Sequence, residues 1–277
     1  MKLWVDADPL IYQAAYVAEY NIWSVGDQHF KYKKEAEEYK IRTGLLEVEL
    51  GKTPVLEDIS LAISAMKNSI RGVIDQCVNV YPGISEYTLV ISGVSNYRNK
   101  ISANYKVGRV KPTYYAELRN KILNWGAIVQ EQLEADDLIA VLHTKEYKKD
   151  KASSVIATID KDLYILPGLH YDWRRKEAKD VTPEYAQRWF FRQLLHGDRT
   201  DTIKGIHRVG KETAKAFIDS LAGKYAEEKL EAIVGLWKDK EPLTYAYRLQ
   251  ENWKLLDIGG YYSPYLKKLK EILAYVA

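Results

Sequence analysis

The chain has 277 residues, of which 47% are hydrophobic and 29% charged, the balance of an ordinary globular protein with room for one large domain or two small ones. Its net charge of +3 is too small to indicate a polyanionic partner by itself, and its single cysteine, Cys77, excludes a disulfide framework and a cysteine zinc site. The N-terminus MKLWVDAD does not resemble a signal peptide, and no apolar run reaches the ~18 residues of a membrane span, so we expect a cytoplasmic protein without membrane contact.

Short apolar runs rich in Val and Ile predict buried strands along the first part of the chain. They are KLWVD (2–6), YTLVISG (87–93) and SSVIATIDKD (153–162), with GAIVQE (126–131) as a fourth candidate. Helical patterns lie between them at about 56–80, 112–124 and 135–149. This alternation predicts an α/β fold with a mostly parallel sheet flanked by helices, whose functional crevice lies beyond the carboxyl ends of the strands.

Two segments depart from this alternation. Residues 20–55 mix aromatic residues with the charged run KYKKEAEEYK and are interpreted as an insertion. After about residue 175 the strand signals fade, and VTPEYAQRWFFRQLLHG predicts a helix capped by Thr182, with Pro183 at its first position, that ends at Gly197. We therefore expect a sheet domain over residues 1–178 and a helical region over 179–277.

Three carboxylates stand within four positions in EADD (134–137), directly before an aliphatic run. On a regular helix Asp136 would point ~200° away from Glu134, so the three acids converge only if the helix begins inside the motif. Like charges this close repel one another, and desolvation adds to the cost. A solvated, acid-rich helix start is the alternative interpretation.

Further acids favour a shared site. Asp6 and Asp8 end the first predicted strand, Asp160 and Asp162 end the third, and Asp198 and Asp201 stand in GDRTDTIKGIHRVGKETA. Carboxylates without cysteine or histidine are typical ligands of Mg²⁺ or Mn²⁺ rather than Zn²⁺. Two such ions ~4 Å apart can activate a water and stabilise the leaving oxygen of a phosphodiester.

The motifs VDAD, NYKVGR, EADD, TIDKDL and GDRTDTIKGIHRVGKETA occur in an order that resembles the 5′→3′ exonucleases and flap endonucleases, especially the compact phage type. The resemblance spans nearly the whole chain. It implies a PIN-like sheet domain with two Mg²⁺ sites, where Mn²⁺ would substitute, and a helical arch at about 95–125. It also implies a helix–hairpin–helix variant at about 197–218 that grips duplex DNA, with K⁺ at the hairpin.

Carried over position by position, the resemblance assigns metal ligands. Asp6, Glu134 and Asp136 match the first metal site; Asp137, Asp160, Asp162, Asp198 and Asp201 match the second. Asp8 has a counterpart in only part of the family. The family normally has an aspartate where this chain has Gly93, so we expect a weakened first site and a lower Mg²⁺ requirement in a Gly93→Asp variant.

Basic residues complete the assignment. In the family the residues matching Lys106 and Arg109 project to the scissile phosphate, where positive charge stabilises the transition state. Tyr105 is either a stacking platform for a terminal base or a packed core residue, and Lys111 is a further DNA contact. The remaining predicted DNA contacts are Lys204, Gly205, Arg208, Gly210, Lys211 and Lys215. Glycine usually stands at Arg208 in the family, and lysine at Glu212, so the hairpin departs from the pattern.

The resemblance implies a magnesium-dependent enzyme that hydrolyses DNA at 5′ ends, flaps or duplex–single-strand junctions, acts as a monomer, and works in the bacterial host cytoplasm if a phage encodes it. Three alternatives remain at this stage. WVDADPL also imitates the Asp-x-Asp of haloacid-dehalogenase-type phosphatases, with Asp6 as the nucleophile and Asp8 as the acid. A catalytically decayed DNA-binding homologue and an RNA-directed nuclease on a similar fold are the others.

Overall fold

The computed structural model describes residues 1–276, and these fold into two compact units. The first unit comprises residues 1–7, 74–109 and the chain from Ala127 onward, and the second comprises residues 8–73 and 110–126. Helix α3 (Ile59–Val80) contributes to both units. The predicted division at residues 178 and 179 does not separate compact units, because both sides of it belong to the first.

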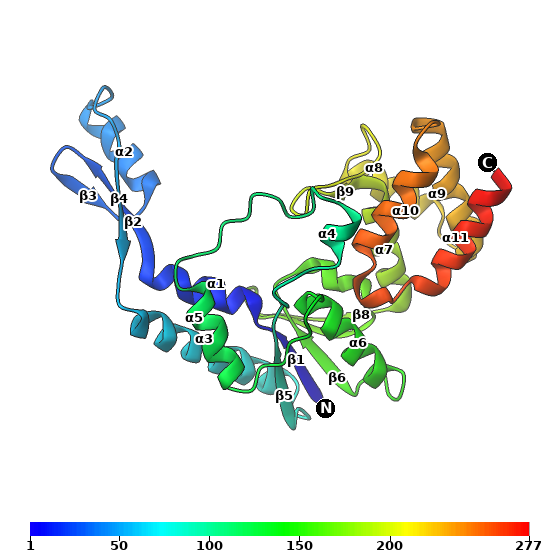
Figure 1. The fold of residues 1–277 in the computed structure, drawn as a ribbon, viewed down its shortest axis with the longest axis horizontal. Helices are drawn as coiled ribbons and strands as arrows, with labels where there is room; N and C mark the ends of the chain where they lie inside the picture. Colours follow the sequence, from blue (N-terminus) through cyan, green and yellow to red (C-terminus); the bar gives the residue numbers. More distant parts are fainter. Residues whose placement is uncertain (277) are drawn as a thin grey trace. The chain divides into compact units, whose positions relative to one another are not determined.

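The first unit is built on a five-stranded sheet in the order β5-β1-β6-β7-β8 (Figure 1). Strand β1 (Lys2–Asp6) pairs in parallel with β5 (Glu86–Val90) and β6 (Ser154–Ala157), and β7 (Gly168–Asp172) continues in parallel beyond β6. Val5 lies opposite both Leu89 and Ala157, so the carboxyl ends of β5, β1 and β6 are level. The predicted α/β fold with a mostly parallel sheet is confirmed.

Two predictions about strands were wrong. The candidate strand at 126–131 makes only an isolated bridge, in which Ile128 lies beside Val90. Strands β7 and β8 (Glu177–Val181) were not predicted, and β8 runs antiparallel to β7 at the sheet edge. Four of the five side chains of β8 are at least partly exposed, so its sequence lacks the apolar run that marks a buried strand.

The C-terminal part of the first unit is helical, with a short hairpin between its first two helices. Its elements are α7 (Pro183–His196), β9 (Gly197–Asp198), β10 (Ile203–Lys204), α8 (Lys211–Ser220), α9 (Ala226–Lys240), α10 (Tyr245–Leu256), η2 (Ile258–Gly260) and α11 (Ser263–Val276). Helix α7 begins where the Thr182 hydroxyl accepts the N–H of Tyr185 at 3.2 Å and ends at Gly197, as predicted.

A single core joins these helices to the sheet. Phe190 of α7 stacks on Tyr262 with ring centroids 4.3 Å apart and meets Trp253 edge-on at 4.9 Å. These rings are buried together with Trp4 of β1 and Ile156 of β6. Helix α6 (Ala135–Tyr147), predicted at 135–149, packs on the sheet itself. The C-terminal helices therefore share one buried core with the sheet.

The second unit contains the segment that departs from the strand–helix alternation. Its elements are α1 (Asp8–Ala18), β2 (Glu19–Val25), β3 (Gln28–Phe30), α2 (Lys33–Thr43), β4 (Gly51–Leu56), the first part of α3 and α5 (Tyr115–Asn124). Strands β3, β2 and β4 form an antiparallel sheet. The ammonium groups of Lys33 and Lys52 lie 5.7 and 5.8 Å from the ring centre of Trp23, so one indole contacts both α2 and β4.

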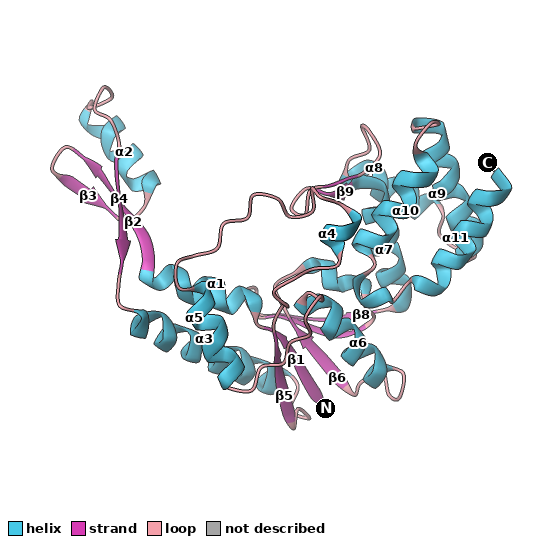
Figure 2. Cartoon of the chain, in the orientation of Figure 1, coloured by secondary structure: helices cyan, strands magenta, loops and turns pink. Residues whose placement is uncertain are grey.

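The region expected to form a helical arch is only helical at its ends. Helix α4 (Arg98–Ile101) and helix α5 flank residues 102–114, which contain turns and extended chain but no helix (Figure 2). Along residues 1–276, no helix is both long and apolar enough to cross a membrane.

Candidate active site

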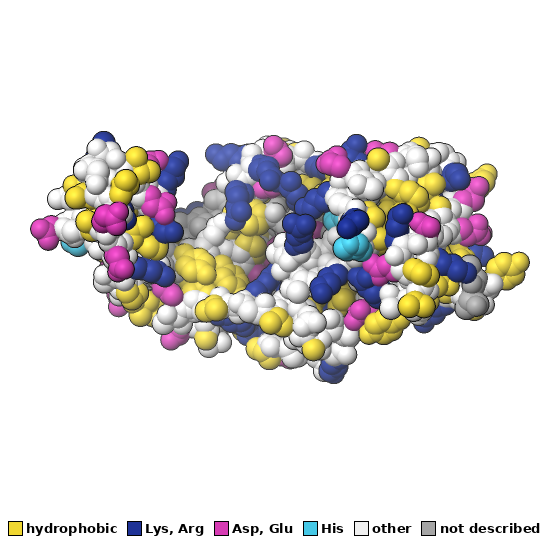
Figure 3. Space-filling view, turned by 90° about the horizontal axis from the view of Figure 1, so that it is seen from above, with side chains coloured by type: hydrophobic (Ala, Val, Ile, Leu, Met, Phe, Trp, Pro, Cys, Tyr) yellow, Lys and Arg dark blue, Asp and Glu magenta, His cyan; other side chains and the backbone are white. Residues whose placement is uncertain are grey.

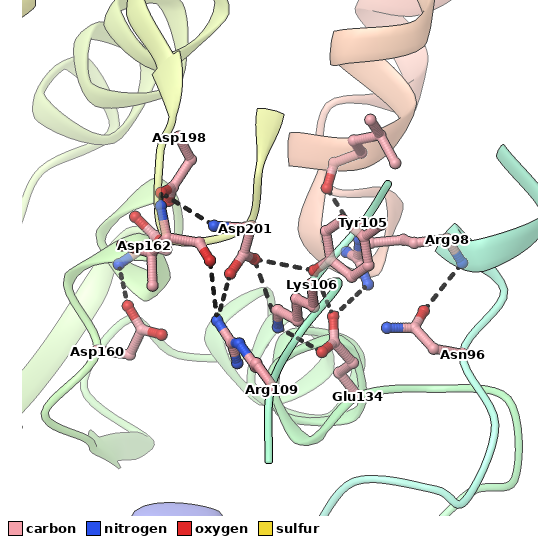
Figure 4. A network of polar contacts seen from close by, with 12 residues as sticks. Asn96, Arg98, Tyr105, Lys106, Arg109, Glu134, Asp160, Asp162, Asp198 and Asp201 are labelled. Atoms are coloured by element: carbon pink, nitrogen blue, oxygen red, sulfur yellow. Dashed lines mark hydrogen bonds and ion pairs between the residues drawn. The ribbon is translucent and has the colours of Figure 1, made fainter. Parts of the chain in front are cut away.

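Carboxylates gather at the carboxyl edge of the sheet in the first unit, as predicted (Figure 4). Asp6 is the last residue of β1, while Glu134 and Asp136 stand at the start of α6. The acids that line one narrow cavity there are Glu134, Asp136, Asp160, Asp162, Asp198 and Asp201. Acids as far apart in sequence as Glu134 and Asp201 therefore lie in one cavity.

Local hydrogen bonds fix several of these carboxylates. Asp160 caps the 3₁₀ helix η1 (Lys161–Ile165), accepting the N–H of Asp162 at 2.8 Å. The Thr158 hydroxyl donates to Asp6 at 3.0 Å. The Gln193 amide on α7 donates to Asp162 at 2.6 Å. Each acid thus has a defined position before any ligand arrives.

The start of α6 agrees with the sequence argument about EADD. Glu134 is the N-cap of the helix, with an extended backbone (φ −77, ψ 160), and Asp136 lies in the first turn. The helix therefore begins inside the motif, and Glu134 and Asp136 line the same cavity. Asp137 is turned elsewhere, as described below.

Burial and mutual repulsion make the acids resist ionisation. Burial and the negative charges of Asp6 and Asp160 raise the pKa of Asp136 well above its ordinary value. Burial and the charges of Asp160 and Asp198 raise the pKa of Asp162 to about 8. Burial likewise raises the pKa of Asp160. The cavity is therefore a place where added positive charge is strongly favoured.

The loop after α4 supplies part of that charge. The ammonium of Lys106 pairs with Glu134 and lies 3.4 Å from Asp201, and Arg109 donates to Asp201 at 2.7 Å. Burial alone would raise the pKa of Glu134, but the charges of Lys106 and Arg98 hold it below its ordinary value. Lys106 and Arg109, predicted to face a phosphate, thus lie against the acids.

Tyr105 is a core residue and not an open stacking platform. Its side chain is 6% exposed, and its hydroxyl donates to Glu134 at 2.7 Å and to Asp201 at 2.9 Å. Of the two interpretations left open by the sequence, the packed tyrosine is correct.

Arg98 is a residue of the site that the sequence analysis missed. It is 2% exposed, and its guanidinium donates to both oxygens of Asp137 at 2.5 and 2.7 Å and to Glu134 at 3.2 Å. Its Nε donates to the carbonyl of Leu255 at the end of α10. Arg98 stands directly after Tyr97 in a short segment with no motif, so only a search for basic partners of EADD could have suggested it.

The prediction that Asp137 is a metal ligand disagrees with this arrangement. Asp137 is 1% exposed, and its carboxylate also accepts the N–H groups of Gly259 at 2.9 Å and Glu134 at 3.3 Å. Both of its oxygens are therefore used by a bidentate ion pair and by backbone donors, which leaves it a structural acid.

Asp8, predicted as a metal ligand, and Lys111, predicted as a DNA contact, lie in the second unit. Asp8 begins α1 near Tyr115, whose pKa is raised by burial and by the Asp8 charge. The ammonium of Lys111 lies 4.5 Å from the ring centre of Tyr115. Neither belongs to the cavity described above.

Gly93 is not a vacant ligand position, contrary to our expectation. A Cβ at this residue would lie 2.6 Å from the carbonyl oxygen of Gln130 and 2.9 Å from the carbonyl carbon and oxygen of Glu131. The Gly93 N–H also donates to the carbonyl of Leu133 at 2.8 Å. The glycine allows two backbone segments to approach closely, and any side chain would separate them.

The donor chemistry of the cavity fits a hard divalent cation. Its acids offer only oxygen, and no cysteine or histidine lines it. Within residues 1–276, however, no three Asp, Glu, His or Cys side chains are already grouped so that they could hold a metal ion. Glu134 and Asp201 are instead paired with Lys106, Tyr105 and Arg109.

The predicted DNA-binding hairpin follows α7. Lys204, Arg208, Lys211 and Lys215 are exposed, and Gly210 is the N-cap of α8. Arg208, where the family usually has glycine, has φ 61 and so keeps a left-handed backbone. A Cβ at Gly205 would lie 2.2 Å from the carbonyl carbon of His196, so this glycine is needed for close approach.

Basic side chains surround this hairpin. A pocket of about 580 Å³ is lined by Arg199, Lys204, His207 and Arg208 among others. Figure 3 shows Lys and Arg side chains (dark blue) gathering on one face of the molecule with His side chains (cyan) among them. Such a surface favours an anionic partner.

Proteins of similar sequence include exonucleases. The chain is 30% identical over 171 residues to a 5′–3′ exonuclease of Buchnera aphidicola, 28% identical over 153 residues to an exodeoxyribonuclease of enterobacteria phage T3, and 29% identical over 133 residues to an exonuclease of Escherichia phage T7. These matches cover 55%, 52% and 45% of this chain and 54%, 49% and 44% of those proteins, so the chain spans about half the length of the curated relatives it matches. No family model matches the chain.

Solved structures share the fold over nearly the whole chain. The 5′-exonuclease of phage T5 with bound divalent zinc ions has a TM-score of 0.55 at 13% identity, covering 99% of both chains. A complex of the phage T5 flap endonuclease with DNA and metal ions has a TM-score of 0.50 at 15% identity, covering 76% of this chain and 90% of that one. The fold of this protein is thus that of the phage T5 5′-exonuclease.

Replacement of Gly93 by alanine or aspartate should destabilise the protein. Overpacking against backbone that cannot move aside costs about 1–3 kcal/mol. Urea unfolding measures the loss, with Gly235→Ala as the control: Gly235 lies inside α9 with no atom within 4 Å of an added Cβ, so alanine there should stabilise by roughly 0.5–1 kcal/mol. A Gly93→Asp variant as stable as the wild type would contradict the close approach.

Replacement of Arg98 by methionine should cost about 3–5 kcal/mol, because it leaves the buried Asp137 charge without its partner. Chemical unfolding at neutral pH measures the change. Lys100→Met is the matched control, since Lys100 is an exposed cation on the same helix. The free energy of unfolding of this variant should lie within about 0.5 kcal/mol of that of the wild type. Equal stability of the two variants would mean that Arg98 does not hold the site.

Divalent cations should raise the melting temperature, and by more at pH 8 than at pH 6. The folded-state pKa of Asp162 is about 8, against an ordinary value of 3.8, so the folded protein binds this proton more tightly than the unfolded chain. The stabilisation that comes from the protonated Asp162 carboxyl is then present at low pH and is lost as the pH rises toward 8. Mg²⁺ or Ca²⁺ relieves the repulsion that ionisation creates. Calorimetry of the protein with and without cation checks this; an equal or smaller rise at pH 8 would contradict it.

Proposed function

We propose that this protein is a divalent-metal-dependent 5′ nuclease that hydrolyses phosphodiester bonds of DNA by a two-metal mechanism. The observation that carries the proposal is the excess of carboxylates at the sheet edge over the basic residues that face them. Asp136, Asp160 and Asp162 have raised pKa values, so the basic residues of the cavity do not balance its carboxylates. Sequence similarity to 5′–3′ exonucleases and the shared fold support the same assignment.

The resemblance to the family divides the acids between two metal ions. We assign Asp6, Glu134 and Asp136 to the first metal ion and Asp160, Asp162, Asp198 and Asp201 to the second, without Asp137. The bound ions, Mg²⁺ with Mn²⁺ as a substitute, would supply an activated water and charge for the leaving oxygen. Thr158 and Gln193 keep Asp6 and Asp162 in place, which limits the reorganisation required when charge builds up in the transition state.

Lys106 and Arg109 have a double role in this proposal. Before DNA binds, they neutralise part of the charge on Glu134 and Asp201. A scissile phosphate would offer the same cations a more anionic partner, which Arg109 can contact through two nitrogens at once. Their contribution is largest in the transition state, when the phosphate oxygens carry most charge.

Duplex DNA next to the scissile bond would contact the basic hairpin. Lys204 and Arg208 line its pocket, and Lys211 begins α8, where the helix N-terminus favours a phosphate. A phage T5 flap endonuclease of similar fold was solved in complex with DNA, which supports DNA as the partner; 5′ ends, flaps or junctions are the forms of DNA that we propose as substrates. Action as a monomer in the cytoplasm remains a prediction from the sequence.

The deciding experiment is cleavage of 5′-labelled flap and duplex DNA with Mg²⁺, with Mn²⁺ and in excess EDTA. Cleavage should require the cation. Asp136→Asn and Asp162→Asn should lower the rate at least about 100-fold, because each removes a charged metal ligand. Asp239→Asn is the matched control: Asp239 is 68% exposed on α9 and should leave the rate unchanged.

The same assay distinguishes the alternatives. Cleavage that persists in EDTA would contradict metal dependence, and DNA binding without cleavage would indicate a decayed homologue. An RNA strand of the same sequence and a generic phosphomonoester are run beside the DNA. Preferred cleavage of the RNA strand would indicate an RNA-directed nuclease. Preferred hydrolysis of the phosphomonoester would indicate a phosphatase.

A further inference from the structure

Side chains of α10 hold the hairpin loop, residues 203–210, by its carbonyl oxygens. The Arg248 guanidinium donates through Nη2 to the carbonyl of Lys204 at 3.1 Å and to that of Gly205 at 3.0 Å. The Asn252 amide donates to the same Lys204 carbonyl at 2.9 Å. One positively charged group thus bridges two consecutive carbonyls of the loop.

Glu241 fixes the guanidinium from the other side. Arg248 pairs with the Glu241 carboxylate, whose side chain is only 9% exposed, and the other Glu241 oxygen accepts the N–H of His207 at 3.1 Å. The guanidinium also lies 5.2 Å from the ring centre of Trp237. The loop is therefore held at Lys204, Gly205 and His207 by one connected group of side chains.

These contacts decide whether the K⁺ expected at the hairpin fits. A monovalent cation at a turn needs convergent carbonyl oxygens that have no other donor. The carbonyls of Lys204 and Gly205 already accept N–H groups from Arg248 and Asn252, and a second cation beside the guanidinium would be repelled. The Lys204 and Gly205 carbonyls therefore do not fit K⁺.

We propose that Arg248 is a positioning residue that takes the place of a bound monovalent cation at the hairpin, so that the hairpin keeps its DNA-binding conformation without K⁺. This rests on the proposed function, because DNA is taken as the ligand of the hairpin. The guanidinium holds the Lys204 and Gly205 carbonyls, and it lines one pocket together with the side chains of Lys204, His207 and Arg208.

The test measures the affinity for 5′-labelled flap DNA in EDTA, which prevents cleavage, in potassium, sodium and tetramethylammonium chloride at equal ionic strength. Tetramethylammonium is too large to enter a carbonyl site. The wild type should bind within about twofold in all three salts, whereas Arg248→Ala should bind roughly tenfold more weakly. Lys254→Ala is the matched control, because Lys254 is an exposed cation on the same helix and removes the same charge.

Hydrogen exchange of the loop amides gives a second measurement that needs no DNA. Exchange at residues 203–210 should be the same in potassium and tetramethylammonium for the wild type and several-fold faster in Arg248→Ala, with the sheet and the other helices unchanged. Arg248→Lys should recover only part of the protection, since an ammonium cannot reproduce the planar fork.

Either of two results would overturn the proposal. One is a wild type whose loop protection or DNA affinity rises several-fold in K⁺ over tetramethylammonium. The other is an Arg248→Ala variant that matches Lys254→Ala in both measurements. A wild type that binds no DNA in any salt would contradict the proposed function instead, and the exchange measurement would still decide the role of Arg248.

Discussion

The repulsion between carboxylates at the sheet edge is the constraint on which the rest of the first unit depends. A fold that brings Glu134, Asp136, Asp160 and Asp201 to one cavity must balance their charge or keep some of them protonated. Both responses are present. Lys106 and Arg109 pair with Glu134 and Asp201, while Asp136 and Asp162 have raised pKa values. The remaining need for positive charge is what suits the site to a divalent cation.

Two arginines connect the parts of this unit in the same way. Arg98 bonds the Leu255 carbonyl and the carboxylates of α6, and Arg248 bonds the hairpin carbonyls and Glu241. A planar guanidinium carries five donors in a fixed fork, so it can bind a carboxylate and a carbonyl in defined directions, a geometry that the rotating ammonium of lysine does not reproduce. Because Arg98 binds the end of α10 and Arg248 projects from it, this helix links the acidic cavity to the basic hairpin.

Much of the site was predictable because its residue types carry the chemistry in the sequence. The strand end at Asp6 followed from a short apolar run, whereas β6 ends at Ala157, three residues before Asp160; the helix start at Glu134 followed from the angle between successive residues. The boundaries of α7 followed from Thr182, Pro183 and Gly197. The edge strand β8 was missed because its exposed polar side chains give no apolar signal.

The sequence by itself placed Asp6 and Asp160 at one edge of the sheet, since a carboxylate at or just beyond the end of a buried parallel strand lies at the carboxyl edge. It also determined the chemistry of a possible ligand, because only oxygen donors are available. The tertiary structure alone decided which acids are open. Asp137 and Asp136 are neighbours in the chain, yet Arg98 and the Gly259 N–H occupy the first while the second lines the cavity. It likewise decided that Gly93 meets the backbone of Gln130 and not a metal site. Such outcomes depend on contacts between residues far apart in the chain, which no local pattern encodes.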